Sequence, residues 1–387
     1  MITAAHLMSS GGLYGAEHMF LSLAGGLRSL NCHVRLGVFH NAQAGRPALG
    51  DAARQQDIET APFHCQGRWD WSCLQAIRSW LRVTRPDVVH CHGYKADLYG
   101  YAAARGLGIP LVATCHNWTN ENRNLKLYAH ADRVVLRRFH HVAAVSANVE
   151  TCLIGAGVPA RKLSVIGNGV PVEAIASAGP SLGALAGESR QLVGAVGRMV
   201  ESKGFDVLLR AIPRVIEEAP GTKFVLVGDG PERERLEAMA AGMGLRQHVV
   251  FTGVRGDMPG VYRSLSQFVL PSFNEGMPMS VLEAMAASVP VVATRVGALP
   301  ELIGDAQAGM LVNPGEPGEL AGAILQLLRA PAQARSMGLN GYAWVRDRYS
   351  SRAMAQTYLK LYESLLGEGR SSGALVAGEV VDKGAAA

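Results

Sequence analysis

The sequence predicts an α/β protein in which two doubly wound, parallel-sheet (Rossmann-like) domains face a cleft. Short runs rich in Val and Ile alternate with helix-length segments whose apolar residues recur three and four positions apart. This alternation breaks off over the Pro-, Gly- and Ala-rich stretch 171–187 and then starts again. The chain has 387 residues, 48% of them apolar, which is enough for two domains that each bury a core.

The first domain is expected to cover residues 1–170. Its predicted strands are residues 2–8, 33–39, 87–91, 110–114, 141–145 and 163–166. Between most of them lie segments with helical spacing, such as Met19-Phe20-Leu23-Leu27 and Leu74-Ile77-Leu81. Strands that alternate with helices form a parallel sheet, so polar residues that follow the strands meet at one edge, where ligands bind.

The second domain is expected at residues 189–350, after a linker at 171–188. Its predicted strands are residues 192–196, 223–227, 248–252, 267–270 and 289–293. A last helix at 351–366 has Met354, Tyr358 and Leu361 at helical spacing and is expected to return to the first domain. Beyond it, Gly, Ala and Ser without periodicity predict a mobile tail at 367–387.

The net charge of +5 is too small over this length to indicate a nucleic-acid partner. It is unevenly distributed, because residues 1–170 hold 17 Lys and Arg against 10 Asp and Glu, and the rest hold 20 against 22. One basic segment, 123–141, carries five cations with apolar residues between them: Arg123, Lys126, Arg133, Arg137 and Arg138. It predicts either a peripheral contact with an anionic membrane or a solvated helix.

Two further features concern the cellular compartment. The chain has no run of 18 consecutive apolar residues, and its first residues lack the basic start and apolar stretch of a secretory signal. We therefore expect a cytoplasmic protein, with the basic segment as a contact for the inner face of the membrane. The six cysteines show no CxxC spacing, so we expect buried free thiols and neither a zinc site nor a disulfide framework.

The stretch 271–286 holds the most informative candidates. A buried strand ends at its first residue and a proline suited to the first turn of a helix follows, so the backbone N–H groups of Gly276 and Met277 point outward unpaired. Glu275 precedes that helix, and Glu283 lies inside it. The two carboxylates predict a site for a polyhydroxyl ligand, although as isolated residues they fit solvated helix-end charges equally well.

A second candidate segment, 193–204, follows the first strand of the second domain. Arg198 comes directly after that strand, and Lys203 stands five residues later, just before a helix. Two cations at a strand end beside a helix start are suited to a diphosphate, with the guanidinium as a fork and the ammonium as a point charge. The P-loop pattern GxxxxGK[ST] is absent, and the Gly-Asp-Gly-Pro stretch at 228–231 fits a tight turn.

Taken together and in this order, these segments resemble the GT-B glycosyltransferases of family 4 (group 1 type). The resemblance covers residues 1–366. It is carried by four motifs: Gly197-Arg198 with Lys203-Gly204, Gly228-Asp229-Gly230-Pro231, Phe251-Thr252-Gly253, and the pair Glu275 and Glu283 with seven residues between them. The resemblance implies a retaining enzyme that transfers a sugar from a nucleotide diphosphate donor.

Carried onto the matching positions, the resemblance places the donor in the second domain. Arg198 and Lys203 would neutralise the donor diphosphate. Glu275 would be a catalytic residue that binds hydroxyls of the transferred sugar. The other donor contacts would be the backbone N–H groups of Gly276 and Met277 at the sugar, Glu283 at the ribose and Val254 near the base.

In the first domain, Tyr14-Gly15-Ala16-Glu17 takes the place of the family's Gly-Gly-x-Glu/Gln loop. Tyr14 departs from the first glycine, so only Gly15 is carried over as a donor contact. Thr114-Cys115-His116 follows a predicted strand and resembles the family's T-x-H segment, whose histidine faces the reacting sugar, so His116 is the second catalytic candidate. The pair His90 and His92 would bind a metal only with further ligands.

The resemblance implies a glycosyltransferase that uses a UDP- or GDP-linked sugar and a glycan or lipid-linked acceptor, in cell-envelope, exopolysaccharide or lipopolysaccharide synthesis. No Asp-x-Asp occurs, so we expect no metal and no other cofactor, with cations neutralising the diphosphate. We favour a front-face route to retention because no carboxylate nucleophile stands out in the first domain. Three alternatives stay open: a non-catalytic scaffold of a polysaccharide assembly, a UDP-sugar epimerase, and a nicotinamide-dependent oxidoreductase. The last of these lacks its usual G-x-G-x-x-G motif.

Overall fold

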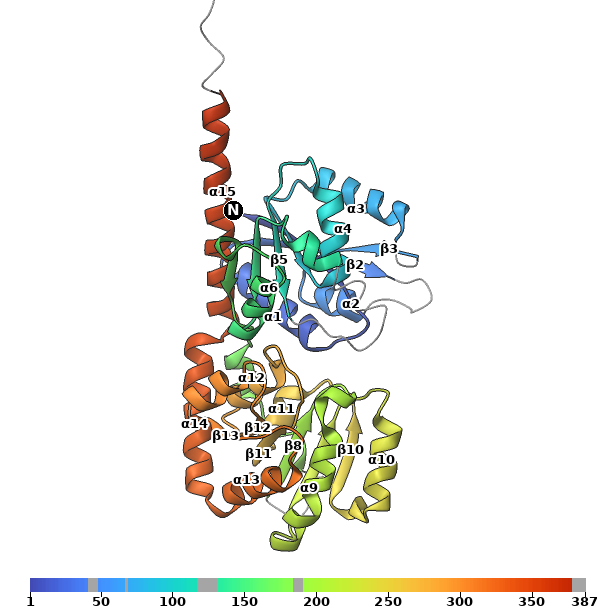
Figure 1. Cartoon of the computed structure of the whole chain (residues 1–387), viewed down its shortest axis with the longest axis vertical. Coiled ribbons are helices and arrows are strands. Elements are labelled where there is room, and N and C mark those ends of the chain that lie inside the picture. The colour runs from blue at the N-terminus through green and yellow to red at the C-terminus, as the bar shows by residue number, and fades with distance from the viewer. Residues whose placement is uncertain (41–47, 67–68, 117–130, 184–190, 378–387) are drawn as a thin grey trace, which may run out of the picture.

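The computed structural model of the chain describes residues 1–40, 48–66, 69–116, 131–183 and 191–377. Two parallel sheets with helices around them lie one above the other (Figure 1). The strands of the first sheet come from residues 3–165 and those of the second from residues 192–312. This arrangement confirms the predicted α/β fold class with two doubly wound sheets.

The first sheet has seven strands in the order β3-β2-β1-β4-β5-β6-β7. They are β1 (Thr3–Ser9), β2 (His33–His40), β3 (Glu59–His64), β4 (Val88–His92), β5 (Leu111–Cys115), β6 (His141–Ala144) and β7 (Leu163–Val165). The chain builds outward from β1 to β3 and then crosses to β4, so the strand order reverses between β1 and β4. Ligands of open α/β sheets bind beside such a reversal, at the carboxyl ends of the strands.

The second sheet has six strands in the order β10-β9-β8-β11-β12-β13. They are β8 (Leu192–Val196), β9 (Lys223–Val227), β10 (Val249–Gly253), β11 (Gln267–Leu270), β12 (Val291–Thr294) and β13 (Gly309–Val312). The order reverses between β8 and β11, which pair directly. The two candidate segments of the sequence follow these two strands, so they emerge side by side.

The sequence patterns missed two strands, β3 and β13. Both are edge strands, each paired on one side only. A strand at an edge is paired on one side only, so its sequence need not be a continuous apolar run, which is the case for β3. β13 is an apolar run, but of only four residues. β3 also contains Pro62, which an edge strand accommodates because one row of its N–H groups has no partner strand.

Helices connect the strands and cover the sheets. In the first domain they are α1 (Gly15–Ser29), α2 (Ala48–Gln55), α3 (Trp71–Thr84), α4 (Tyr94–Ala104) and α6 (Ala147–Gly155). In the second domain they are α9 (Phe205–Glu218), α10 (Arg233–Gly242), α11 (Met258–Arg263), α12 (Met279–Ala286), α13 (Pro317–Arg329) and α14 (Pro331–Arg348). Among the helices that the structure describes, none combines the length and the apolar character needed to cross a bilayer.

Helix α3 shows how the sequence sets these elements. The Asp70 side chain accepts hydrogen bonds from the backbone N–H groups of Ser72 and Cys73, which satisfies donors that have no partner at a helix start. The predicted helical triplet Leu74, Ile77 and Leu81 is buried on one face of the helix. All six cysteines are free and five of them are buried, as predicted, whereas Cys152 is exposed.

The stretch expected to be a linker is partly helical. Helix α7 (Val172–Ser177) packs against α11 and α12, and its buried residues Val172 and Ile175 stand three positions apart. The backbone N–H of Ser181 then donates to the carbonyl of Gly260 at 3.1 Å. Within the expected linker at 171–188, residues 172–177 therefore form a helix that packs on the second domain, and residues 184–190 lie outside the described residues.

Helix α15 (Ser351–Ala377) leaves the second domain and packs against α1 along the side of the first domain (Figure 1). It extends to Ala377, which corrects the expected end of this helix at residue 366, whereas the mobility of the tail at 367–387 stays a prediction. The segment from Gly367 to Ala377 contains no proline, and a glycine lowers helix stability by only about 1 kcal/mol relative to alanine. Composition alone therefore does not end the helix; residues 378–387 lie outside the described residues.

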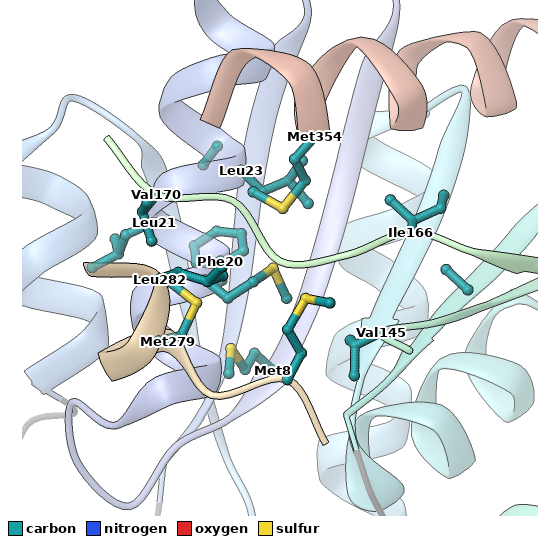
Figure 2. Close-up of a cluster of buried hydrophobic side chains, with 14 of the residues drawn as sticks. Met8, Phe20, Leu21, Leu23, Val145, Ile166, Val170, Met279, Leu282 and Met354 are labelled. Carbon is teal, nitrogen blue, oxygen red and sulfur yellow. The ribbon is translucent and has the colours of Figure 1, made fainter. Parts of the chain in front are cut away.

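The chain crosses between the domains twice, and the two crossings touch. The backbone N–H of Val170 donates to the Tyr349 carbonyl at 2.9 Å, and the N–H of Ser351 donates to the Val170 carbonyl at 2.8 Å. Beside this hinge lies a cluster of buried apolar side chains (Figure 2). It joins α1 to α12 and α15 and contains Met8, Phe20, Leu21, Leu23, Val145, Ile166, Val170, Met279, Leu282 and Met354. Because residues of both domains share one apolar core, their relative placement is fixed by packing.

Candidate active site

The loop between β11 and α12 holds Glu275 in a fixed place. The carboxylate is 6% exposed, and its Oε1 accepts hydrogen bonds from Lys203 Nζ and Ser272 Oγ, each at 2.6 Å. The backbone carbonyl of Ser272 in turn accepts from Thr294 Oγ1 at 2.6 Å. An ion pair with hydrogen bonds on both sides compensates the burial of the carboxylate. Two of the predicted donor-binding residues, Lys203 and Glu275, are thus in direct contact.

The next residue, Gly276, touches the first domain. A Cβ atom at this position would clash with the backbone carbonyl oxygen of His116, so only glycine permits the approach. This contact brings the two catalytic candidates, His116 and Glu275, to opposite sides of the same interdomain boundary.

The loop is also tied down from the hinge side. Asn168 Nδ2 donates to the Met277 carbonyl at 2.8 Å, and the backbone N–H of Ala298 donates to the Gly276 carbonyl at 3.1 Å. The carbonyl groups of this segment are therefore engaged. Within the described residues, the backbone N–H groups of Gly276 and Met277 donate to no acceptor. Two backbone donors at the start of α12 are thus available to a polar ligand.

Glu283 lies one turn inside α12, where the sequence places it. Its Oε2 accepts a hydrogen bond from the Tyr262 hydroxyl at 2.7 Å. Burial raises the pKa of Glu283 to about 7, and the Tyr262 hydrogen bond opposes part of that rise. Near neutral pH this carboxyl group therefore exists in both protonation states.

Arg198 follows β8 and is exposed. Its guanidinium carbon lies 5.6 Å from the centroid of the Tyr14 ring, which belongs to the first domain. Val254, which follows β10, is 74% exposed at the outer side of the second sheet. The structure thus places Arg198 at the interdomain boundary and Val254 at a strand end two strands away from β8.

Gly15 is the first residue of α1. A Cβ atom built on it would lie 3.7 Å from Cγ of Met279, the first residue of α12. The starts of these two helices therefore face each other across the boundary. Gly15 therefore lies next to the second domain, and its contact with the donor stays a prediction.

His116 follows β5 and its Nε2 is buried. Within the described residues, this nitrogen has no hydrogen-bond partner. Burial lowers the pKa of His116 to about 4, so the imidazole is neutral at physiological pH. A neutral ring offers a hydrogen bond to a ligand without adding charge.

Three further histidines lie behind His116 on the same face of the first sheet. His6 Nδ1 and His92 Nε2 share a hydrogen bond at 3.0 Å, and burial lowers the pKa of His6 to about 3. The ring nitrogens of His90 bind the Tyr362 hydroxyl at 2.6 Å and Thr114 Oγ1 at 2.7 Å. The sequence analysis missed His6, because its place beside the other two depends on the pairing of β1 with β4.

This histidine cluster supplies the third ligand that the pair His90 and His92 lacked in the sequence. One nitrogen of each of the three rings lies within 4.8 Å of the others. However, both nitrogens of His90 already bind hydroxyl groups of α15 and β5. The donor set therefore fits a neutral hydrogen-bonded network better than a metal site, which needs free nitrogen lone pairs.

The basic segment is only partly described, because residues 117–130, with Arg123 and Lys126, lie outside the described residues. Arg137 Nη2 donates to the carbonyl of Ala156 at 2.6 Å, next to the end of α6. Leu136 is buried, whereas Val134 is 48% exposed. Part of this segment therefore packs on the first domain, and its contact with a membrane stays a prediction.

Both halves of the chain match known families. Residues 14–174 match the family described as Glycosyltransferase Family 4, and residues 190–330 match Glycosyl transferases group 1. The phosphatidyl-myo-inositol mannosyltransferase of Mycobacterium leprae is 31% identical over 304 residues, which cover 76% of this chain and 77% of that protein. The 2-deoxystreptamine glucosyltransferase of Streptomyces kanamyceticus is 29% identical over 319 residues, or 77% and 81% of the two chains.

Solved structures show the same fold. Anabaena Alr3699/HepE in complex with UDP-glucose superposes with a TM-score of 0.83 over 94% of this chain and 100% of that one, at 23% identity. Because both families cover the matching domains and the mannosyltransferase match spans most of both proteins, the chain belongs to the family 4 (group 1) glycosyltransferases and has their GT-B fold.

Proposed function

We propose that this glycosyltransferase moves a sugar from a UDP- or GDP-linked donor to a glycan or lipid-linked acceptor, with retention of configuration, in the synthesis of a cell-envelope polysaccharide. The observation that carries the proposal is the ion pair of Lys203 and Glu275, set one residue from the contact between Gly276 and His116. Three groups therefore lie at one interdomain boundary: a cation that can bind a phosphate, a carboxylate that can bind sugar hydroxyls, and a neutral imidazole.

The diphosphate belongs near Arg198 and Lys203. Within the described residues Arg198 forms no ion pair with a carboxylate, so its charge is available to a phosphate. Lys203 is 24% exposed and shared with Glu275, so a bound phosphate would compete for the same ammonium group. In this arrangement Glu283 serves the ribose and the backbone near Val254 serves the base. The complex of Anabaena HepE with UDP-glucose supports a nucleotide-sugar donor.

The sugar belongs between Glu275 and His116. The carboxylate accepts hydrogen bonds from sugar hydroxyls, and the backbone N–H groups of Gly276 and Met277 donate to other oxygens of the sugar. His116 contributes a neutral hydrogen-bonding ring from the acceptor side. These groups are held by neighbouring hydrogen bonds before the donor arrives, so little reorganisation is needed as charge develops.

The proposed chemistry is a front-face displacement. The acceptor hydroxyl oxygen forms a bond to the anomeric carbon on the side from which the diphosphate departs. The electron pair of the breaking carbon–oxygen bond goes to the departing phosphate, and a phosphate oxygen takes the acceptor proton. Arg198 and Lys203 stabilise the added negative charge, a role that requires position and charge and no covalent intermediate.

Ligand-dependent thermal unfolding tests the donor class directly, because a ligand that binds the folded state raises the unfolding temperature. We expect stabilisation by UDP or GDP and none by ADP or NAD. The anomeric configuration of the product, measured by NMR, tests retention. Stabilisation by NAD alone, or an inverted product, would contradict the proposal.

The acceptor side includes the proposed membrane contact of the basic segment. Each cation near an anionic surface contributes about 1 kcal/mol, so the segment would hold the protein reversibly. We expect co-sedimentation with vesicles that contain phosphatidylglycerol at low salt, and release at high salt. The variant R133Q/R138Q should bind less, whereas R210Q on α9 of the second domain serves as the control. Equal binding to neutral and anionic vesicles would rule out this contact.

A further inference from the structure

Tyr14 lies where the family's loop has its first glycine. The backbone conformation at this position allows a residue other than glycine. Its φ of −113° and ψ of −166° lie in the extended region, which any residue adopts. The Tyr14 N–H donates to Glu17 Oε2 at 3.1 Å, and the His18 N–H donates to the Tyr14 carbonyl at 3.0 Å. Tyr14 therefore contributes to the start of α1 through its backbone, and its side chain is not needed there.

The Tyr14 ring folds back over its own loop and faces the second domain. A Cβ atom on Gly12 would lie 2.7 Å from Cε2 of the ring, so the small residue at position 12 makes room for it. The ring is 44% exposed and carries the Arg198 guanidinium carbon at 5.6 Å from its centroid. This distance is within the range of a cation–π interaction.

The two cations expected at the diphosphate differ in their partners. Lys203 is fixed by its ion pair with Glu275. Among the described residues, the partner of Arg198 is the Tyr14 ring. A long exposed arginine loses side-chain entropy when it binds a phosphate, and a ring that restrains it beforehand reduces that loss. A cation–π contact uses the face of the ring and leaves the guanidinium N–H groups free to donate.

We propose that Tyr14 is a positioning residue that holds the Arg198 guanidinium at the diphosphate end of the donor site. The inference rests on the proposed function, since it requires a nucleoside diphosphate as the ligand. It names a contribution from the first domain that acts through a residue of the second. Tyr14 should affect only the binding of the phosphates, because it acts on the ligand by positioning Arg198.

The test compares ring-retaining with ring-deleting variants, using UDP and GDP as probes in calorimetric titrations. We expect Y14L and Y14M to raise the dissociation constant of the diphosphate that the wild type binds, and the donor KM, by about two- to fivefold. Y14F and Y14W should stay near the wild type, and kcat should change little. The affinity for the matching nucleoside should be unchanged in all four.

A matched control is Y342L, because the Arg346 guanidinium lies 5.9 Å from the Tyr342 ring within α14, and its loss should leave the diphosphate affinity unchanged. The double variant Y14L/R198A should bind no more weakly than R198A, because Tyr14 acts through Arg198. Wild-type affinity in Y14L and Y14M, or additive losses in the double variant, would overturn the inference and leave the proposed function standing. A wild type that binds neither diphosphate would overturn both.

Discussion

The two sheet domains differ in how they hold polar side chains beside the proposed site. The first domain holds four histidines here, the buried His6, His90 and His92 and the half-buried His116, whose pKa values burial lowers, so their rings are neutral at pH 7. The second domain instead holds the ion pair of Lys203 and Glu275, with Lys203 24% exposed. In the proposed site, these histidines therefore give the acceptor side neutral polar groups, and the ion pair gives the donor side its charges.

The net charges of the two halves run the other way from the charges beside the site. Residues 1–170 contain the larger excess of Lys and Arg, and also eleven of the twelve histidines. Among the described residues of this half, no Lys or Arg is buried. The buried groups next to the site are instead neutral or paired, because burying a charge without a partner is costly. A charge count therefore indicates which surface attracts an anion, but it does not locate the charges that act in the site.

The largest effect should come from removing the charge of Glu275. Glu275→Gln preserves the shape of the side chain but loses the carboxylate that Lys203 and Ser272 orient. We expect kcat to fall about a hundredfold, because a preorganised electrostatic contact to the reacting sugar is lost. Steady-state kinetics with circular dichroism as a folding check provide the measurement.

Glu237→Gln is the matched control for this substitution. Glu237 is an exposed residue of α10 that pairs with Arg233, so its variant should keep wild-type turnover. A near-normal kcat in a folded Glu275→Gln variant would show that Glu275 does not act in the active site. The contrast between neutral histidines in the first domain and a functional ion pair in the second would then not hold.

The histidines of the first domain should make the protein sensitive to acid. His6 has a pKa near 3 when folded and about 6.5 when unfolded, so the unfolded chain binds the proton first as the pH falls. Stability is therefore complete above pH 6.5 and is lost below it, by about 1.4 kcal/mol per pH unit for this residue. In urea titrations at pH 7, 6 and 5, His6→Gln should show a shallower loss than the wild type.

His33→Gln provides the comparison, because the His33 side chain is 44% exposed at the start of β2. Its variant should follow the wild-type dependence on pH. Parallel curves for all three proteins would show that His6 is not the neutral buried group described here.

A smaller effect, on the donor KM, is expected from Glu283, whose hydrogen-bond partner is the Tyr262 hydroxyl and not a cation. Its pKa of about 7 means that the carboxylate form prevails at pH 8 and the protonated form at pH 6. If the ribose binds the carboxylate, the donor KM should rise as the pH falls from 8 to 6, by at most about tenfold. Glu283→Gln should have a raised KM that does not vary with pH, and a kcat close to that of the wild type.

Stability gives an independent check on the same residue. Because the folded pKa of Glu283 is above its ordinary value of 4.5, the contribution to stability is complete below pH 4.5 and is lost as the pH rises through 7. Glu283→Gln should remove this loss. An unchanged dependence of both KM and stability on pH would show that Glu283 does not titrate in this range.

The sequence predicted which candidate residues the second sheet brings together. Arg198, Lys203 and Glu275 follow β8 and β11, and neighbouring parallel strands bring their carboxyl ends together. The positions of the central strands were also predictable, since β8 and β9 lie where their apolar runs are. The edge strands β3 and β13 were not, because β3 contains polar residues and Pro62, and β13 is an apolar run of only four residues.

The contacts between the domains could not be predicted. The approach of Gly276 to His116, and of Arg198 to Tyr14, depends on how two separate sheets are oriented. That orientation is set by the shared apolar cluster and by α15, whose members are far apart in the sequence (Figure 2). Periodicity reports which face of an element is buried, but not which partner covers it.

The smallest effect should be that of a metal chelator, for which we expect none. In the proposed site the diphosphate charge is compensated by Arg198 and Lys203, whereas a bridging metal would need oxygen ligands beside the phosphates. Glu275 already receives hydrogen bonds from Lys203 and Ser272, so it is poorly suited to that task. Transfer should therefore be equal with excess EDTA and with added Mg²⁺ or Mn²⁺, measured as product formed per minute. Loss of activity in EDTA that Mg²⁺ restores would mean that a metal, and not the two cations, neutralises the diphosphate on the donor side.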